Sequence, residues 1–181
     1  MRKLLPLILL LVSNCSLASD DFQWKLANGD QAPETENQKS VKGFGGWLLV
    51  TPDQNWEEKW MTPRGNVPYF SEAKNVKLGE ELTILPFFAN PKLDGAQNFM
   101  ILCDIKVERP DGTLSINELN VPCAQGKMEM DPMSIFLTQT VIKYIGEKGD
   151  LLGVWTVYFE MKDSVRGVSV PLKTSFNLVA K

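Results

Sequence analysis

Alternation of apolar and polar side chains with a period of two is the feature that most limits how this chain can fold. In residues 153–163 ("GVWTVYFEMKD"), one parity carries Trp155, Val157, Phe159 and Met161, and the other is mostly polar. Successive side chains of a β-strand point to opposite faces, so this pattern predicts a strand with one buried face.

The same period continues after the turn "DSVRG", in residues 168–178. The side chains that we expect to face inward are those of Val168, Val170, Leu172, Phe176 and Leu178. Pro171 falls on the outward parity and has no N–H to donate to a neighbouring strand. Its position indicates that this strand runs along an edge of its sheet there.

Residues 99–123 predict a hairpin that carries two cysteines. Apolar side chains alternate along its first half, and "RPDGT" is typical of a turn because proline presets φ and glycine tolerates a positive φ. The apolar parity then switches around residues 117–118, as a β-bulge would produce. Such a bulge would bring Cys103 and Cys123 together on the apolar face, so we predict a disulfide between them in an oxidising compartment.

Two more segments complete the strand pattern. Residues 76–88 ("VKLGEELTILPFF") predict a strand pair broken at Gly79. Residues 134–150 carry apolar side chains on both parities, and their β-branched content favours one strand covered on both sides over a helix. Seven or eight short strands with Gly, Pro and Asp turns predict an all-β fold, an immunoglobulin-like antiparallel β-sandwich.

Some of these segments also carry a resemblance to known proteins. "GDLLGVWTVYFEMKDSVRGVSVPLKTSFNL", with "VKLGEELTILPFF" before it, resembles the final hairpin and an early core strand of immunoglobulin-like or macroglobulin-like sandwiches. The stretch from Gly43 onward is similar to a family of uncharacterised exported proteins of Gram-negative bacteria, through a Gly-x-Trp that opens a core strand and a Pro-Asp-Gly turn. This resemblance implies the sandwich fold and export, and it brings no catalytic residues.

The N-terminus predicts export. Residues 1–18 combine a short basic start, an apolar run from Leu4 to Val12 and small residues before a cleavage point after Ala18, as in a signal peptide. The run is too short to span a bilayer. Lipoprotein processing at Cys15 is the alternative, but it requires a small residue where Asn14 stands. We expect a periplasmic or secreted protein.

The rest of the chain divides into two parts. Residues 19–42 are expected to be an N-terminal segment and a flexible linker, because they are largely polar and contain Gly, Pro and Asn. Residues 43–181 are expected to form the sandwich. The glycines of "GFGG", residues 43–46, lack the context of a phosphate-binding loop, so we expect them to permit close approach to the backbone.

Composition argues against most chemistry. The 181 residues contain no histidine, which removes Ser-His-Asp and Cys-His catalysis and most zinc and copper sites. The net charge is −3 and no Lys/Arg cluster occurs, so we expect no nucleic-acid partner. No later segment reaches the length of a membrane span. The adjacent pairs Glu57-Glu58 and Glu80-Glu81 diverge in direction, and we expect no enzyme activity, no metal site and no cofactor.

Three tryptophans provide the candidate site: Trp47, Trp56 and Trp60. A short helix is expected near residues 53–61, begun by Thr51 or Asp53 as N-cap and ended by Thr62-Pro63. Trp56 and Trp60 would share one face of it. They could form a lid over the open end of the sandwich, a surface for a partner or for self-association, or a platform for sugars.

These observations favour a non-catalytic exported binding module. Its expected partner is another protein of the cell envelope or a second copy of the chain. The alternative is a carbohydrate-binding module that uses the Trp56/Trp60 pair, with Asn55, Glu57, Glu58 and Asn66 as hydrogen-bonding neighbours.

Overall fold

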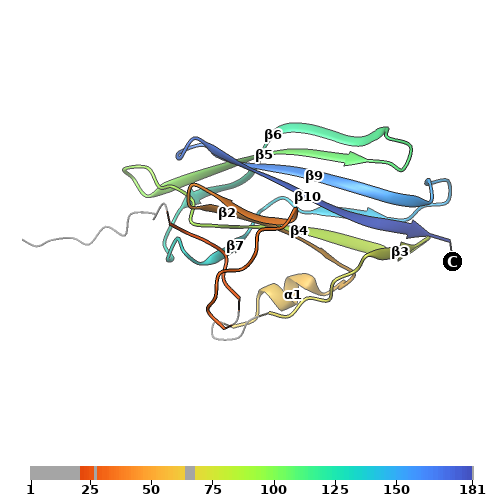
Figure 1. Ribbon diagram of the computed structural model, residues 1–181, viewed down its shortest axis with the longest axis horizontal. Helices are drawn as coiled ribbons and strands as arrows, with labels where there is room; N and C mark the ends of the chain where they lie inside the picture. The colour runs from red at the N-terminus through yellow and green to blue at the C-terminus, as the bar shows by residue number, and fades with distance from the viewer. Residues whose placement is uncertain (1–20, 27, 64–67, 181) are drawn as a thin grey trace, which may run out of the picture.

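The computed structural model describes residues 21–26, 28–63 and 68–180 (Figure 1). The predicted signal peptide lies outside them. The described residues form two five-stranded sheets and one short helix, α1 (Trp56–Trp60). Sheet one contains β1 (Gln38–Val41), β2 (Phe44–Thr51), β4 (Glu81–Ala89), β7 (Ile135–Leu137) and β8 (Ile142–Ile145). Sheet two contains β3 (Asn75–Lys77), β5 (Asn98–Glu108), β6 (Leu114–Lys127), β9 (Gly153–Asp163) and β10 (Val168–Val179).

The two sheets pack face to face as an all-β sandwich, which confirms the predicted fold class. Sheet one has the order β1-β2-β4, and both β7 and β8 pair with the far edge of β4. Sheet two has the order β3-β10-β9-β5-β6. Neighbouring strands are antiparallel except for β3 and β10, which are parallel. The core between the sheets draws on β2, β4, β5, β9 and β10.

The period-two patterns of β9 and β10 correctly identify the side chains of this core. Trp155, Val157, Phe159 and Met161 are all buried. The five residues predicted to face inward from β10 also belong to the core or pack against it. Within the described chain, β3 pairs only with the last residues of β10, so Pro171 lies on an edge, as predicted.

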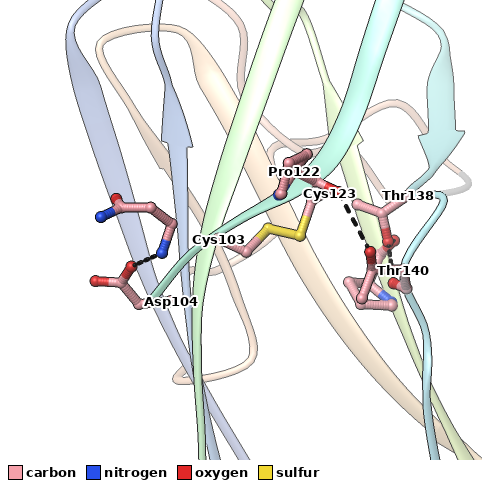
Figure 2. Close-up of a disulfide and its surroundings, with 8 residues drawn as sticks. Cys103, Asp104, Pro122, Cys123, Thr138 and Thr140 are labelled. Atoms are coloured by element: carbon pink, nitrogen blue, oxygen red, sulfur yellow. Dashed lines mark hydrogen bonds between the residues drawn. A yellow bond between two sulfur atoms is a disulfide. The ribbon is translucent and has the colours of Figure 1, made fainter. Parts of the chain in front are cut away.

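A disulfide joins Cys103 of β5 to Cys123 of β6, as predicted, with 5.9 Å between their Cα atoms (Figure 2). Both side chains are fully buried. Ile101 pairs with Ala124 and Leu102 pairs with Pro122, so Cys123 is itself the extra residue of a bulge. The bulge lets β6 place the Cys123 sulfur on the inner face.

The bulge predicted at residues 117–118 is instead centred on Asn120. The pairing changes between Cys103–Val121 and Ile105–Glu118. Asn120 has a φ of 53°, which asparagine tolerates better than most residues. The carboxylate of Asp104 accepts its backbone N–H at 2.8 Å. The bond from Asn120 to Asp104 therefore fixes the position of this bulge. The position predicted from the parity switch alone was two residues too early in the sequence.

The single strand predicted in residues 134–150 is wrong, since β7 and β8 are separate. The interruption lies opposite Pro86 of β4, which has no N–H to offer a neighbouring strand. Thr138 turns there, and its backbone N–H and its Oγ1 both donate to the Pro86 carbonyl, at 3.0 and 3.1 Å. The backbone N–H of Gln139 donates to the Cys123 carbonyl at 2.7 Å and so joins sheet one to the edge of sheet two.

The predicted linker is also corrected, because its last residues form β1. The backbone of Gln38–Val41 pairs with Trp47–Phe44 of β2. An edge strand can be polar because backbone hydrogen bonds hold it, and this explains why no apolar alternation marked β1. Residues 21–26 and 28–37 also pack on the sandwich, since Phe22 and Trp24 are buried against sheet one.

Two glycines of "GFGG" permit close approach, as predicted. A Cβ atom at Gly45 would overlap the Phe22 ring on the outer face of sheet one. A Cβ atom at Gly46 would lie 3.0 Å from Leu172 Cδ1 on the inner face. These glycines let β2 carry packed layers on both of its faces.

Candidate functional site

The outer face of sheet one carries a second apolar layer and an open groove. Trp47 and Leu49 of β2, with Leu85 and Phe87 of β4, point away from the core between the sheets. Helix α1 covers part of this face, and the N-terminal segment covers another part (Figure 1). The predicted lid over the open end of the sandwich is therefore misplaced, because α1 lies on a sheet face.

Four aromatic rings form the floor of what we call the aromatic groove. Phe87 is at the centre and is 1% exposed. The Trp47 ring stacks on it with 5.0 Å between centroids and an interplanar angle of 27°. The Trp60 and Phe70 rings lie tilted beside it at 5.3 and 6.1 Å. Trp47, Trp60 and Phe70 are each half-buried, so each presents part of its ring to the groove.

The remaining residues of the aromatic groove come from two loops and from the first residue of β7. Its volume is about 920 Å³, which is within the usual range for ligand-binding pockets. Thr62 and Pro68 line one side. The other side, which we call the acidic wall, is residues 129–135, and it lines the groove with Glu129, Met130, Asp131, Ser134 and Ile135.

Hydrogen bonds hold the acidic wall in place. The Asp131 carboxylate accepts the Met133 backbone N–H at 2.9 Å, and the Asp131 carbonyl accepts the Ser134 N–H at 2.9 Å. The Pro132 carbonyl accepts the N–H of Asn90, which directly follows β4. The wall is therefore anchored to the same strand that supplies Phe87.

Asp53 fixes the opposite side of the groove. Its carboxylate accepts Lys59 Nζ at 2.6 Å and the Ser71 backbone N–H at 2.8 Å. Lys59 precedes Trp60 and Ser71 follows Phe70, so one carboxylate sets the spacing of two groove rings. Burial alone would raise the Asp53 pKa, but the bonds from Lys59 and Ser71 outweigh it and lower this pKa to about 2.

The expected N-cap residues have other tasks. Asn55 occupies the N-cap position of α1 and makes no side-chain capping bond. Thr51 Oγ1 instead accepts the Asp53 backbone N–H at 3.1 Å. A helix of five residues gains little from its own hydrogen bonds, and its position depends mainly on packing and on Asp53.

The structure separates the three predicted tryptophans. Trp47 and Trp60 line the aromatic groove. Trp56 lies beneath α1 against Leu49 and Leu85, is 7% exposed, and offers no ring to a ligand. Trp56 and Trp60 do share the face of α1 that packs on sheet one, as their spacing predicted.

The sequence reasoning missed Phe70, Phe87 and the acidic wall. A signal for Phe87 was available, because β4 is apolar at nearly every position, and strands of that composition are covered on both faces. Phe70 and residues 129–134 of the wall lie in irregular segments, where periodicity gives no information.

The other carboxylates considered in the sequence are surface groups. Glu57 and Glu58 are exposed on α1. Glu80 accepts the Lys77 backbone N–H at 3.0 Å, and Glu81 lies 3.3 Å from Lys143 Nζ. Within residues 21–26, 28–63 and 68–180, no three Asp, Glu, Cys or His side chains form a metal-binding group. No helix in this part of the chain is long and apolar enough to cross a membrane.

A second cavity, of about 520 Å³, opens where the edges of β2 and β10 meet. Leu48 and Phe176 line it, and an ion pair between Glu36 and Lys173, at 3.5 Å, lies at its rim. Both apolar side chains belong to the core between the sheets and are almost fully buried. The aromatic groove is the stronger candidate because its rings are themselves accessible.

Comparison with known proteins adds little to this geometry. No family model matches the chain, and no curated protein matches it either. Among solved structures, a family 123 glycoside hydrolase from Clostridium perfringens is similar over 75% of this chain and 28% of its own, with 9% identity and a TM-score of 0.40. A Pseudomonas fluorescens alkylpurine DNA glycosylase is similar over 72% of this chain and 29% of its own, with 11% identity and a TM-score of 0.39.

A Niemann-Pick type C2 protein from the Japanese carpenter ant is similar over 74% of this chain and 89% of its own, with 8% identity and a TM-score of 0.34. This chain spans less than a third of the length of the first two proteins. All three TM-scores are below 0.5, so neither a fold assignment nor a function is taken from them.

Proposed function

We propose that this protein is a non-catalytic exported binding module whose aromatic groove holds a segment of a partner protein. The observation that carries the proposal is the set of three half-buried rings around buried Phe87, in a groove of about 920 Å³. Tryptophan is enriched among the residues that dominate binding energy at protein interfaces, which supports a protein partner.

The rigidity of the groove supports the same proposal. Phe87 lies on β4 and Trp47 on β2, which pair with each other at these two residues. Asp53 restrains the segments that carry Trp60 and Phe70. Rings that are fixed before binding lose little conformational entropy when a partner docks, so more of the contact energy contributes to affinity.

Export is part of the proposal. The N-terminal sequence has the pattern of a signal peptide, and the chain contains the Cys103–Cys123 disulfide. Disulfides persist in the periplasm and outside the cell and are rare in the cytosol. We therefore propose that the partner is located in the cell envelope or outside the cell.

A carbohydrate ligand is the second candidate. It is favoured by Thr62, Ser134, Glu129 and Asp131, which bring hydroxyl and carboxylate groups next to the rings, as sugar recognition requires. Against it, the two rings of the Trp56/Trp60 pair are not accessible together. Trp56 is buried and contributes no platform.

Capture with matched variants tests the proposal. Wild-type protein, Trp60→Ala, Ile135→Ser and Tyr158→Ala would each be used as bait for envelope extract and applied to a glycan array. Ile135 is 45% exposed in the groove, so its substitution perturbs the core little, and Tyr158 is 38% exposed on the outer face of sheet two. Circular dichroism would confirm that every bait is folded.

We expect Trp60→Ala and Ile135→Ser to lose a captured protein that Tyr158→Ala retains. Equal capture by all four baits would reject the groove as the docking site. Glycan binding that Trp60→Ala removes, without groove-dependent protein capture, would replace the proposal with the carbohydrate alternative.

A further inference from the structure

Among the described residues that line the aromatic groove, the charged side chains are all acidic. Glu129 and Asp131 line it, and both are exposed. No Lys or Arg is among the lining residues in the described part of the chain. The groove therefore combines negative charge with aromatic surface, and this combination narrows the choice of occupant.

Both features of the groove attract cations. A carboxylate forms short, charge-assisted hydrogen bonds with Lys or Arg. The faces of tryptophan and phenylalanine rings attract the same cations through their quadrupoles, and tryptophan does so most strongly. Because apolar groups such as Ile135 and Met130 line the same groove, an occupant would gain most by carrying apolar and basic side chains together.

Charge also argues against a second copy of this chain as the occupant. In a twofold dimer through this face, the acidic walls of both copies would lie within one interface, because such an interface uses the same patch twice and brings no basic lining residue from either described copy. The chain has a net charge of −3, with 22 acidic and 19 basic side chains, so contact between copies is repulsive overall as well. A partner of opposite charge does not have this repulsion.

Building on the proposed function, we infer that the groove selects a protein segment in which Lys or Arg stands directly beside large apolar residues. The apolar side chains lie over Trp47, Trp60 and Phe70, and the cation lies between these rings and the acidic wall. Asp131 is suited to this role because its bond to the Met133 N–H holds the carboxylate at the groove.

Binding of three synthetic octapeptides tests this inference. Each peptide carries a fluorescein label and is unstructured when free. One alternates Lys with Leu or Phe, the second replaces every Lys with Glu, and the third keeps Lys but replaces every apolar residue with Ser. Binding to the purified protein would be followed by fluorescence anisotropy at low and high salt. Two double variants complete the set: Glu129→Gln with Asp131→Asn in the groove, and Glu118→Gln with Glu147→Gln as the control.

The control removes the same number of charges from exposed positions outside the groove lining. We expect the basic-apolar peptide to bind most tightly, and the groove variant to weaken its binding about tenfold while the control changes it less than about twofold. Salt should weaken binding to the wild type more than to the groove variant. In the wild type, salt screens the attraction between the peptide and the carboxylates of Glu129 and Asp131, which the variant lacks.

The possible failures are distinguishable from one another. If the basic-apolar and acidic-apolar peptides bind equally well and Ile135→Ser weakens both, the groove binds protein segments but does not select basic ones. If the control weakens binding as much as the groove variant does, the attraction is a property of net charge and the inference is wrong. If Ile135→Ser changes no peptide's binding, the proposed function itself fails.

Discussion

The outer faces of the two sheets behave in opposite ways. On sheet one, Leu85 and Phe87 are at most 1% exposed because the tryptophans of α1 pack on this face, and Ala89 is buried beneath the N-terminal segment. On sheet two, Tyr158 is 38% exposed, and Lys162 pairs with Asp104 at 2.7 Å on the surface. Sheet one is thus the middle layer of a three-layer arrangement, and sheet two is an outer layer.

This difference shows how each sheet gains its stability. Sheet one buries apolar area on both faces, which contributes roughly 25 cal/mol for each Å² removed from water. Sheet two buries one face only, and the Cys103–Cys123 disulfide crosses its β5–β6 hairpin. The groove is found where the second layer on sheet one is incomplete, which places the candidate site on the more heavily packed sheet.

The largest test of this comparison replaces one aromatic residue on each outer face. Phe87→Ala removes a buried ring that contacts three others, so we expect it to lower the free energy of unfolding by about 3–5 kcal/mol. Tyr158→Ala should lower it by less than about 1 kcal/mol. Urea denaturation measures both values, and similar losses would mean that the second layer adds no stability.

The disulfide should come next in magnitude. Cys103→Ala combined with Cys123→Ala removes a cross-link between residues 20 apart, which is expected to cost about 3 kcal/mol in the chain-entropy model. The near-UV circular dichroism of the tryptophan layer on sheet one should persist in the folded variant, because that layer lies on the other sheet. A loss of this signal in a protein that keeps its strand content would contradict the separation of the two regions.

A pair of glycine substitutions measures how tightly the N-terminal segment is bound to sheet one. Gly45→Ala sets a methyl group against the Phe22 ring, so we expect a loss of about 1–3 kcal/mol. Gly95→Ala has nothing within 4 Å and should be close to neutral. Thermal unfolding compares the two, and an equally neutral Gly45→Ala would show that residues 21–26 do not pack as described.

The smallest effect concerns Asp53 and depends on pH. Its folded-state pKa of about 2 is below its ordinary value of 3.8, so its stabilising contribution is present above pH 3.8 and is lost as the pH falls towards 2. Asp53→Asn should therefore cost about 1–2 kcal/mol at neutral pH and almost nothing near pH 2. Urea titrations across this range give the difference, and a constant gap would assign the effect to shape rather than to charge.

Sequence reasoning performed best where one face of a strand meets solvent. The alternation in β9 and β10 identified the inward side chains because sheet two has a polar outer face. The Cys103–Cys123 disulfide followed from the same alternation and from the turn residues of the hairpin.

It performed worst on sheet one, for physical reasons. β4 is buried on both faces, so its parity does not indicate which side chains face the groove. The break between β7 and β8 depends on Pro86 of a neighbouring strand, and no local pattern in residues 134–150 encodes it. The groove joins residues 47, 60, 70, 87 and 129–135, which only tertiary packing brings together.

The bulged strand β6 has a consequence for how the protein behaves at high concentration. β6 is the edge strand of sheet two, and its pairing with β5 shifts register three times, between Ile101 and Leu102, between Cys103 and Ile105, and between Val107 and Glu108. A strand arriving from solvent would need the same irregular spacing to form a continuous ladder, and regular edges are what aggregating proteins share. Pro122 and the Gln139–Cys123 hydrogen bond obstruct one end of this edge as well. The irregular edge therefore disfavours growth of the sheet into fibrils. Copies of the protein that associate would do so through side-chain contacts rather than through backbone pairing at this edge.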